Sequence, residues 1–370
     1  MKKFALLPII ILLGSLLLIS CDKGESANIL PVVTTTPTPI IPTYNNQADE
    51  EEEGPSELAV WQAYWNNKDI NKEISILKDS INNIIHFAAY FNEENELFIP
   101  KEIMGLHKTE EIDLKEDYNH YLSFVNDKIL SDGKSSLKDT KLLYELFQDD
   151  KSMENHINSI CTLALENGYD GIEIDYEAIK KDMDLWKLYL EFISKLYDKT
   201  KSNNLSMRVV LEPSAPIETL KSGELKFPKG PEYVMMCYNL YGFDSERGPK
   251  ADKEFILSLV NKMKLLQVDM NFAFATGGFD WDENNKIISL TESQALKLQR
   301  TFQANAVRDE KSAALTFSYT DNEGKKHTVW YADGTTLKEW IETAKTEGIS
   351  KFSLWRLNGN ESKSLNILND

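Results

Sequence analysis

The sequence of 370 residues predicts an α/β fold and, within that class, a (β/α)₈ TIM barrel. Short runs rich in Val, Ile and aromatic residues alternate with segments of helical periodicity, a pattern typical of parallel βα units. Eight such runs follow residue 57, which is the number of strands that closes this type of barrel. The runner-up is a doubly wound open sheet, but no glycine-rich phosphate loop follows the first run, which counts against its nucleotide-binding version.

The strand candidates are short, and helical patterns lie between most of them. In chain order the strands are expected at residues 58–65, 84–91, 121–125, 171–176, 206–211, 233–238, 270–275 and 351–355. Amphipathic helical patterns are clearest at residues 141–165, 182–197, 252–266 and 337–346.

One segment, residues 280–336, is too long for a single connection between a strand and a helix. It contains a helix-like stretch at 293–308 and a hairpin candidate, in which the runs 315–320 and 327–331 flank the turn Asp321-Asn-Glu-Gly324. We therefore predict a small α+β insertion between strands seven and eight, which could wall one side of a cleft.

The amino-terminal segment is predicted to be a targeting signal. A basic pair at positions 2–3 precedes an apolar run that ends in Leu18-Ile19-Ser20-Cys21. This arrangement resembles a bacterial lipoprotein signal peptide, which implies removal of residues 1–20 and lipidation of the Cys21 thiol. An uncleaved membrane anchor is the alternative, although the run is short for a spanning helix of about 20 residues.

Residues 21–56 are predicted to be a lipidated tether, because a Thr/Pro run and a block of four glutamates favour unpacked backbone. The catalytic or binding domain would then be residues 57–370, held to a membrane through Cys21. We expect it in the bacterial cell envelope on the extracytoplasmic side, at the cell surface or facing the periplasm.

The composition excludes several partners. The formal net charge of −18 argues against nucleic acid, since phosphate binding needs a basic surface. Besides Cys21, the chain has only Cys161 and Cys237, which we expect to be unpaired buried thiols, with a disulfide as the alternative. Five histidines and no CxxC spacing make a zinc site unlikely, so we expect no metal, and nothing indicates more than a monomer.

The residues that carry chemistry lie in the fourth strand candidate, within Gly168-Tyr-Asp-Gly-Ile-Glu-Ile-Asp-Tyr-Glu177. Alternate residues of a strand share a face, so Glu173, Asp175 and Glu177 form an acidic ladder. Active sites of barrels lie at the carboxyl ends of the strands, which places Glu177 at the mouth and the other two deeper. We expect the deep pair to share a proton, which would keep one acid protonated at neutral pH, as a general acid must be.

This ladder resembles the fourth-strand motif of glycoside hydrolase family 18, Asp-Gly-x-Asp-x-Asp-x-Glu, a family that includes chitinases and endo-β-N-acetylglucosaminidases. Met236-Cys-Tyr-Asn239 is similar to the family's sixth-strand Met-x-Tyr-Asp, and Trp355 lies where the family has a strand-eight tryptophan. The resemblance covers roughly residues 57–357. The segments His327-Thr-Val-Trp-Tyr331 and Leu354-Trp-Arg-Leu357 look most like the bacterial branch of spore-cortex-lytic and related cell-wall enzymes.

The resemblance implies a retaining hydrolase of β-1,4-linked N-acetylglucosamine glycans, such as chitin oligomers, peptidoglycan strands or the N-glycan core, without a cofactor. Glu177 would be the general acid and base, and Asp175 would orient the substrate's own 2-acetamido group, which attacks the anomeric carbon. Tyr238 would hydrogen-bond the acetamido oxygen. The remaining matched positions would support substrate binding, namely Asp170, Glu173, Met236, Asn239 and Trp355.

Two positions depart from the family pattern. Glu173 replaces the usual aspartate and adds a methylene to a tightly packed chain of carboxylates. Asn239 replaces the aspartate after Tyr238 and so removes one charge near the reacting sugar. Neither change removes the acid, and we expect both to alter the pH dependence.

Other residues are expected at the mouth without a motif. Tyr64 and Trp281 are further candidates for substrate contact. Trp281, Trp65 and Trp355 fall at predicted strand ends, where an exposed ring suits sugar stacking, although any one of them could equally be packing. Asn126-Asp127 and Glu212 follow strands three and five, either as substrate contacts or as loop caps.

Two other functions fit the same ladder. One is a non-catalytic glycan-binding lipoprotein on the same barrel, a role in which the terminal glutamate is usually lost although it is present here. The other is a Mg²⁺- or Ca²⁺-dependent enzyme with the three ladder carboxylates as ligands, which a single strand orients poorly for an octahedral site.

Overall fold

A computed structural model of the chain describes residues 57–63, 65, 70–104, 118–131, 133–222, 226–243 and 245–369. These residues fall in one compact unit of the chain, Pro55–Asp370. The predicted signal peptide, Cys21, the tether and Tyr64 lie outside the described residues.

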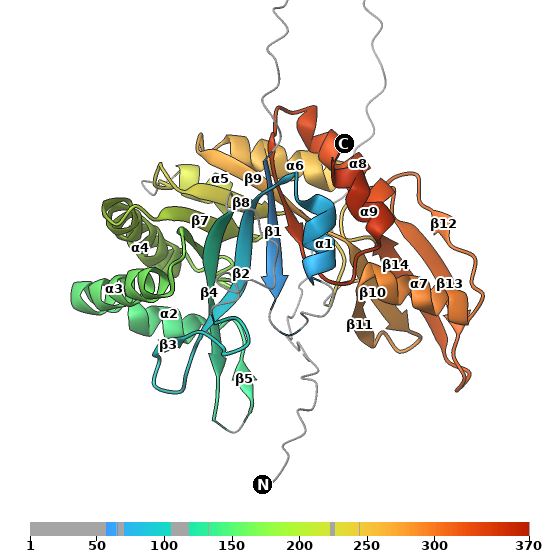
Figure 1. Cartoon of the computed structure of the whole chain (residues 1–370), viewed down its shortest axis with the longest axis horizontal. Coiled ribbons are helices and arrows are strands. Elements are labelled where there is room, and N and C mark those ends of the chain that lie inside the picture. Colours follow the sequence, from blue (N-terminus) through green and yellow to red (C-terminus); the bar gives the residue numbers. More distant parts are fainter. Residues whose placement is uncertain are drawn as a thin grey trace, which may run out of the picture. The chain divides into compact units, whose positions relative to one another are not determined.

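Eight parallel strands form a closed barrel (Figure 1). In their order around the barrel they are β1 (Glu57–Ala63), β2 (Ile81–Phe91), β4 (Asn119–Ile129), β6 (Gly171–Asp175), β7 (Ser206–Leu211), β8 (Glu232–Met236), β9 (Asp269–Ala275) and β15 (Lys351–Trp355). The ring closes where β15 pairs with β1, with Lys351 opposite Glu57. The predicted (β/α)₈ barrel is therefore confirmed, and the open sheet is excluded.

Helices follow most of the barrel strands and cover the outside of the barrel (Figure 1). They are α1 (Ile70–Leu77), α2 (Thr140–Leu146), α3 (Asp150–Asn167), α4 (Met183–Ser202), α5 (Ile217–Ser222), α6 (Lys253–Lys264), α8 (Gly334–Lys345) and, after the last strand, α9 (Ser362–Asn366). Aspartates cap several of them, as at Asp182, whose side chain accepts from Leu185 N at the start of α4.

The helix predicted at residues 141–165 is two helices. Asp149 begins the second of them, because its side chain accepts from Ser152 N and so satisfies a free donor of the first turn. That helix ends at Gly168, whose φ of 75° is the left-handed conformation that glycine adopts readily. Asp149 lies within a continuous apolar pattern, so the periodicity predicted one helix although the capping side chain begins a second.

Two separate cores flank the barrel wall, and β6 shows how the sequence divides between them. Ile172 and Ile174 pack outward against the helices, whereas Glu173 and Asp175 point into the barrel. Gly171 begins the strand where β4 approaches closely, since a Cβ atom there would lie 2.4 Å from the Tyr121 ring. The predicted alternation of the ladder is confirmed.

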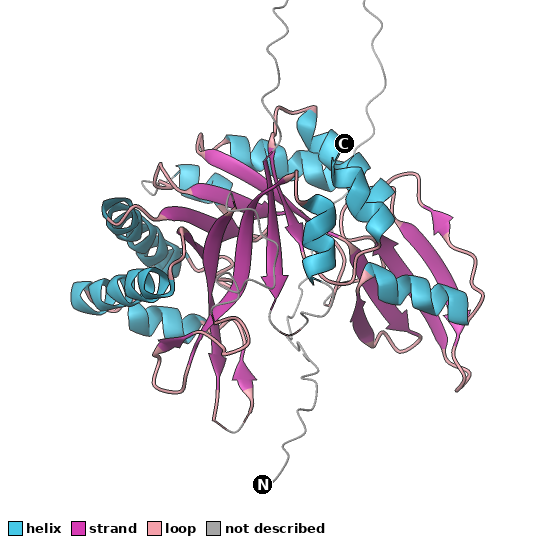
Figure 2. Ribbon diagram, in the orientation of Figure 1, coloured by secondary structure: helices cyan, strands magenta, loops and turns pink. Residues whose placement is uncertain are grey.

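The insertion is a five-stranded antiparallel sheet with one helix, drawn as a second group of strands beside the barrel in Figure 2. Its elements are β10 (Gly277–Asp282), β11 (Ile287–Leu290), α7 (Glu292–Thr301), β12 (Val307–Arg308), β13 (Leu315–Thr320) and β14 (Lys326–Ala332). The predicted hairpin is β13 and β14, while the predicted helix ends earlier than expected, at Thr301.

Two short strands, β3 (Leu97–Phe98) and β5 (Ser135–Ser136), extend β2 and β4 in antiparallel fashion. Within the described part of the chain, every helix is too short or too polar to cross a bilayer.

Candidate active site

The innermost member of the ladder, Glu173, is fully buried and forms an ion pair. Its Oε1 accepts from Trp61 Nε1 at 2.7 Å, and its Oε2 accepts from Arg208 Nε at 2.9 Å. Burial raises the pKa of the Glu173 carboxyl, and the Arg208 charge opposes that rise. Both Glu173 oxygens thus face N–H donors, and the proton expected on the Glu173–Asp175 pair stays a prediction.

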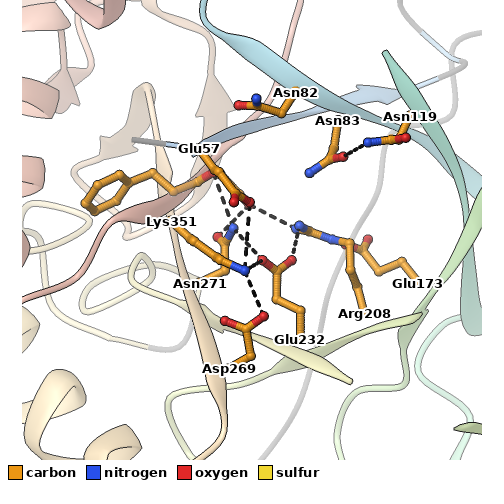
Figure 3. A network of polar contacts seen from close by, with 12 residues as sticks. Glu57, Asn82, Asn83, Asn119, Glu173, Arg208, Glu232, Asp269, Asn271 and Lys351 are labelled. Carbon is orange, nitrogen blue, oxygen red and sulfur yellow. Dashed lines mark hydrogen bonds and ion pairs between the residues drawn. The ribbon is translucent and has the colours of Figure 1, made fainter. Parts of the chain in front are cut away.

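Arg208 joins this glutamate to the floor of the barrel (Figure 3). Its guanidinium is 1% exposed and also bonds Glu232 and the Ser353 hydroxyl. Beyond Glu232, Lys351 lies 2.7 Å from Asp269 Oδ2, at the amino ends of the strands. The floor is thus closed by alternating charges, each with a partner, as buried ions require.

Asp175 lies two residues nearer the mouth than Glu173, and its hydrogen bonding differs from that of Glu173. It is buried, and within the described part of the chain its Oδ1 has no hydrogen-bond partner. Burial raises the pKa of Asp175 well above its usual value, and the charges of Glu177 and Glu173 add to the effect. A buried carboxyl oxygen without a partner is costly in the free protein and is available to a polar group of a ligand.

Glu177 lies two residues beyond the end of β6, at the carboxyl end of the barrel. Its backbone is held by Asn126 on β4, whose side chain accepts from Glu177 N at 2.9 Å and donates to Glu177 O at 3.1 Å. The next residue, Ala178, has a φ of 64°, and its N–H donates to Glu212 Oε2 at 2.8 Å. Two neighbouring strands therefore fix the position of the proposed acid.

A lysine that the sequence analysis missed lies against this acid. Lys138 Nζ is 2.5 Å from Glu177 Oε2, and Lys138 N donates to Asp127 Oδ1 at 2.7 Å. Burial alone would lower the pKa of Lys138, but the charges of Glu177, Glu212 and Asp175 raise it overall. Lys138 is therefore a cation at the centre of an acidic cluster.

The candidates Asp127 and Glu212 belong to that cluster. Burial raises the pKa of Asp127 to about 6, and the Glu177 charge adds to the rise. Burial likewise raises the pKa of Glu212, again with the help of Glu177. Glu212 and Asn126 act here as backbone caps, which was one of the two roles predicted for them.

The sixth-strand motif brings Tyr238 to the same place. Tyr238 and Met236 are buried inside the barrel, in the apolar cluster against which Trp355 packs. Burial raises the pKa of the Tyr238 phenol far above its usual value, and the Asp175 charge adds to the effect. Asn239 is exposed at a φ of 70°, a conformation that asparagine tolerates better than most residues.

Aromatic rings line the mouth on the side of β1 and β15. Trp355 is half-buried and meets the edges of Trp61 and Phe87, with ring centroids 5.7 and 5.0 Å apart. Trp65, which follows β1, is 44% exposed. These two tryptophans retain the accessible surface that sugar stacking needs.

Two predicted contacts are wrong. Trp281 is 0% exposed inside β10, so its ring packs in the insertion and presents no surface to a sugar. Asp170 precedes β6 at the amino end of the barrel, where its Oδ2 accepts from His120 N at 2.8 Å. It supports the strand pairing, about five residues or roughly 16 Å of strand away from Asp175.

Some residues of the site carried a signal in the sequence and others did not. Arg208 lies two residues from Val210 on an otherwise apolar strand, and an inward charge there could have been matched to Glu173. Lys138 lies in a loop and had no such signal. No group of three or more His, Cys, Asp or Glu side chains in the described ranges is arranged to hold a metal ion.

Comparisons with known proteins give relatives of low identity and a shared fold. No protein-family model matches the sequence. The chain is 27% identical over 241 residues to the uncharacterized glycosylase YvbX of Bacillus subtilis, covering 61% of this chain and 68% of that protein. It is 23% identical over 150 residues to the cortical fragment-lytic enzyme of Bacillus anthracis, but this covers only 27% of that protein.

Solved structures share the fold of this chain. A chitinase from Chromobacterium violaceum matches with a TM-score of 0.69 at 14% identity, over 85% of this chain and 98% of that one. The spore cortex-lytic enzyme SleL of Bacillus cereus has a TM-score of 0.69 at 15% identity, over 86% and 74%. A mutant class V chitinase from Nicotiana tobaccum in complex with NAG4 has a TM-score of 0.64 at 14% identity, over 84% and 97%.

Proposed function

We propose that this chain is a glycoside hydrolase that cleaves β-1,4-linked N-acetylglucosamine glycans by a retaining, substrate-assisted mechanism. The comparisons support a glycosidase, because the relatives and structural neighbours are glycosylases, chitinases and cortex-lytic enzymes. The neighbour in complex with NAG4 supports an N-acetylglucosamine glycan as the class of substrate.

The observation that carries the proposal is the convergence of Asp175, Glu177 and Tyr238 at the carboxyl end of the barrel. Asp175 raises the pKa of Tyr238, and Glu177 raises that of Asp175, so the three groups interact electrostatically. Glu177 lies at the mouth, Asp175 is buried with an Oδ1 that has no hydrogen-bond partner among the described residues, and Tyr238 is a buried phenol. This set offers an acid, an acceptor and a donor to a single sugar.

Bond cleavage would use each group in turn. Glu177 gives its proton to the glycosidic oxygen while the acetamido oxygen of the same sugar attacks the anomeric carbon and displaces the leaving sugar. Asp175 accepts from the acetamido N–H, and Tyr238 donates to the acetamido oxygen. Water then attacks the anomeric carbon, gives a proton back to Glu177 and regenerates the acetamido group, so that two inversions leave the configuration retained.

The test is turnover of a fluorogenic N,N′-diacetylchitobioside by the wild type and by Glu177→Gln. Loss of the general acid should lower kcat by about 10²- to 10⁴-fold while the variant still binds chito-oligosaccharide. Exposed Glu154 on α3 supplies the matched control, since Glu154→Gln removes the same charge far from the mouth. Equal turnover by wild type and Glu177→Gln would refute the assignment of the acid.

A second test separates catalysis from binding alone. Glycan binding without turnover on chitin, peptidoglycan or N-glycan substrates, unchanged in Glu177→Gln, would favour the glycan-binding protein. Activity that a chelator abolishes and a divalent cation restores would favour the metal-dependent enzyme.

We also propose that the domain is tethered to a membrane through lipid on Cys21. The support is the signal-like sequence that ends in Leu18-Ile19-Ser20-Cys21. Fatty-acid labelling of the wild type that is lost in Cys21→Ser is the expected result. Labelling retained in that variant would exclude Cys21 as the acceptor.

A further inference from the structure

Two cations lie at the carboxyl end of the barrel, on the side where β8, β9, β15 and β1 end. Arg356 directly follows Trp355, and its guanidinium carbon lies 5.6 Å from the centre of the exposed Trp65 ring. Lys250 donates from Nζ to the carbonyl of Thr276, directly after β9, at 2.9 Å. Both side chains are partly buried.

Neither cation forms an ion pair with any described residue, although Arg208, Arg308 and Lys138 all do. Nη1 of Arg356 makes a single long hydrogen bond, of 3.3 Å, to the Leu357 carbonyl. A partly buried cation without a counter-ion is unfavourable, and it stands out in a chain whose net charge is −18.

The backbone around both cations is held in place. The Thr276 hydroxyl donates to Asn360 Oδ1 at 2.5 Å, and Asn360 Nδ2 donates to the Arg356 carbonyl at 2.9 Å. Glu73, the carboxylate whose charge acts on Arg356, is occupied by backbone and side-chain N–H donors of the same loop. Arg356 and Lys250 are thus presented on a fixed frame, as a binding site requires.

The protonation of Lys250 depends on what lies beside it. Burial lowers the pKa of Lys250 to about 7, and the Arg356 charge adds to the effect. An anion bound between the two cations would raise that pKa again, so binding at neutral pH would take up a proton.

The opposite side of the mouth is acidic. Asp127, Glu177 and Glu212 lie where β4, β6 and β7 end, and they outnumber the two described lysines whose charges act on them, Lys138 and, at Glu212, Lys180. An anionic group on a glycan is repelled by that side and attracted by the side of Lys250 and Arg356. This charge distribution would set both the direction and the register of a bound glycan that carries an anionic group.

On the basis of the proposed hydrolase function, we infer that Lys250 and Arg356 form a subsite for a sugar carboxylate. The preferred substrate would be an N-acetylglucosamine glycan whose neighbouring sugar bears a carboxylate, rather than neutral chitin. Arginine pairs with a carboxylate through two parallel N–H donors, and the exposed Trp65 ring beside it can stack against the sugar that carries the acid.

Three tetrasaccharides test this inference. They are a peptide-free peptidoglycan fragment with free lactyl carboxylates, the same fragment with its carboxylates reduced to alcohols, and chitotetraose. We expect the wild type to show a kcat/KM about tenfold or more higher for the acidic than for the reduced fragment, the usual effect of a charge-assisted pair. Arg356→Gln and Lys250→Met should each lower that ratio by about tenfold, whereas Arg300→Gln, at an exposed site on α7, should keep it.

Binding to the Glu177→Gln variant gives an independent readout. Calorimetry at pH 8 in two buffers of different ionisation enthalpy should show proton uptake with the acidic fragment, none with the reduced fragment, and none when Lys250→Met is added. Proton uptake that persists in the double variant would contradict the role of Lys250.

The outcomes separate the two proposals. Cleavage of chitotetraose with equal kcat/KM for the acidic and reduced fragments would overturn the carboxylate subsite and leave the hydrolase intact. No cleavage of any of the three, together with no turnover of the chitobioside, would overturn the proposed function. A ratio that falls equally in Arg300→Gln would mean that overall charge, and not this subsite, attracts the acidic glycan.

Discussion

Lys138 and Glu177 form an ion pair in which Nζ lies 2.5 Å from Oε2, at the mouth of the barrel. An ammonium at this distance stabilises the ionised carboxylate, whereas a general acid must carry a proton. Lys138 must release Glu177, or a bound glycan must outweigh it, before the glycosidic oxygen can be protonated.

Replacing Lys138 by methionine should extend activity to higher pH. The Lys138 charge lowers the pKa values of Asp127, Asp175 and Glu212, so without the ammonium these carboxyls should keep their protons to a higher pH and the alkaline limb of kcat/KM should move upward. The measurement is a pH–rate profile between pH 4 and 9. Lys128→Met is the control, since the Lys128 ammonium contacts Asn95 Oδ1 instead, and an unmoved limb in Lys138→Met would refute this role.

Glu73 should anchor the loop that follows the last barrel strand. Its buried carboxylate accepts from Asn358 N at 2.7 Å, Gly359 N at 2.9 Å, and both N and Nδ2 of Asn360. Glu73→Ala leaves these donors without their acceptor and should cost about 3 kcal/mol in the free energy of unfolding. Urea denaturation measures this, and a loss no larger than that of exposed Glu154→Ala would contradict it.

Glu292 should make stability depend on pH. Burial raises the pKa of this carboxyl to about 7, above its unfolded value near 4.5. The folded state therefore binds more protons than the unfolded state between these values, and the free energy of unfolding falls as pH rises from 4.5 towards 7. Glu292→Gln should remove about 1–3 kcal/mol of that fall.

The measurement for Glu292 is urea denaturation at half-unit steps between pH 4.5 and 8. Glu283→Gln changes an exposed carboxylate of the same insertion and should leave the slope as in the wild type. If Glu292→Gln and the wild type show the same slope, the raised pKa is not the cause.

Arg208 should be necessary for the fold because it neutralises Glu173. Arg208→Met leaves that buried carboxylate uncompensated and should cost about 3–5 kcal/mol. Adding Glu173→Gln to this variant should recover part of the loss, because the isosteric amide carries no charge. As a control, Lys195→Met breaks an exposed pair with Asp150 and should cost under about 1 kcal/mol.

The barrel could be predicted from the sequence because its strands are short, mainly apolar runs and its helices are apolar on one face. Seven of the eight predicted barrel strands differ from the observed strands by at most three residues at either end. The break between α2 and α3 was missed, since capping by the Asp149 side chain does not disturb the apolar spacing. Periodicity reports burial, and it carries little information about local hydrogen bonds to the backbone.

Only the site residues that lie together on one strand could be predicted from the sequence. Glu173, Asp175 and Glu177 follow from alternation along β6, whereas the partners that decide their charges come from other strands and loops. The ion pair of Glu173 was missed for this reason, because the Arg208 guanidinium arrives from β7. The prediction for Trp281 failed because its ring is fully buried in the insertion sheet, which an apolar run cannot distinguish from an exposed strand end.

The pairing of β1 with β15 has a consequence for synthesis of the chain. The first and last barrel strands are neighbours, and Glu73 on α1 binds the loop that begins at Arg356. The ribosome synthesises β1 and α1 early and β15 late. The ring of strands therefore stays open until Lys351–Trp355 has emerged. A nascent chain therefore has no closed barrel, and premature termination before this strand yields a product without one.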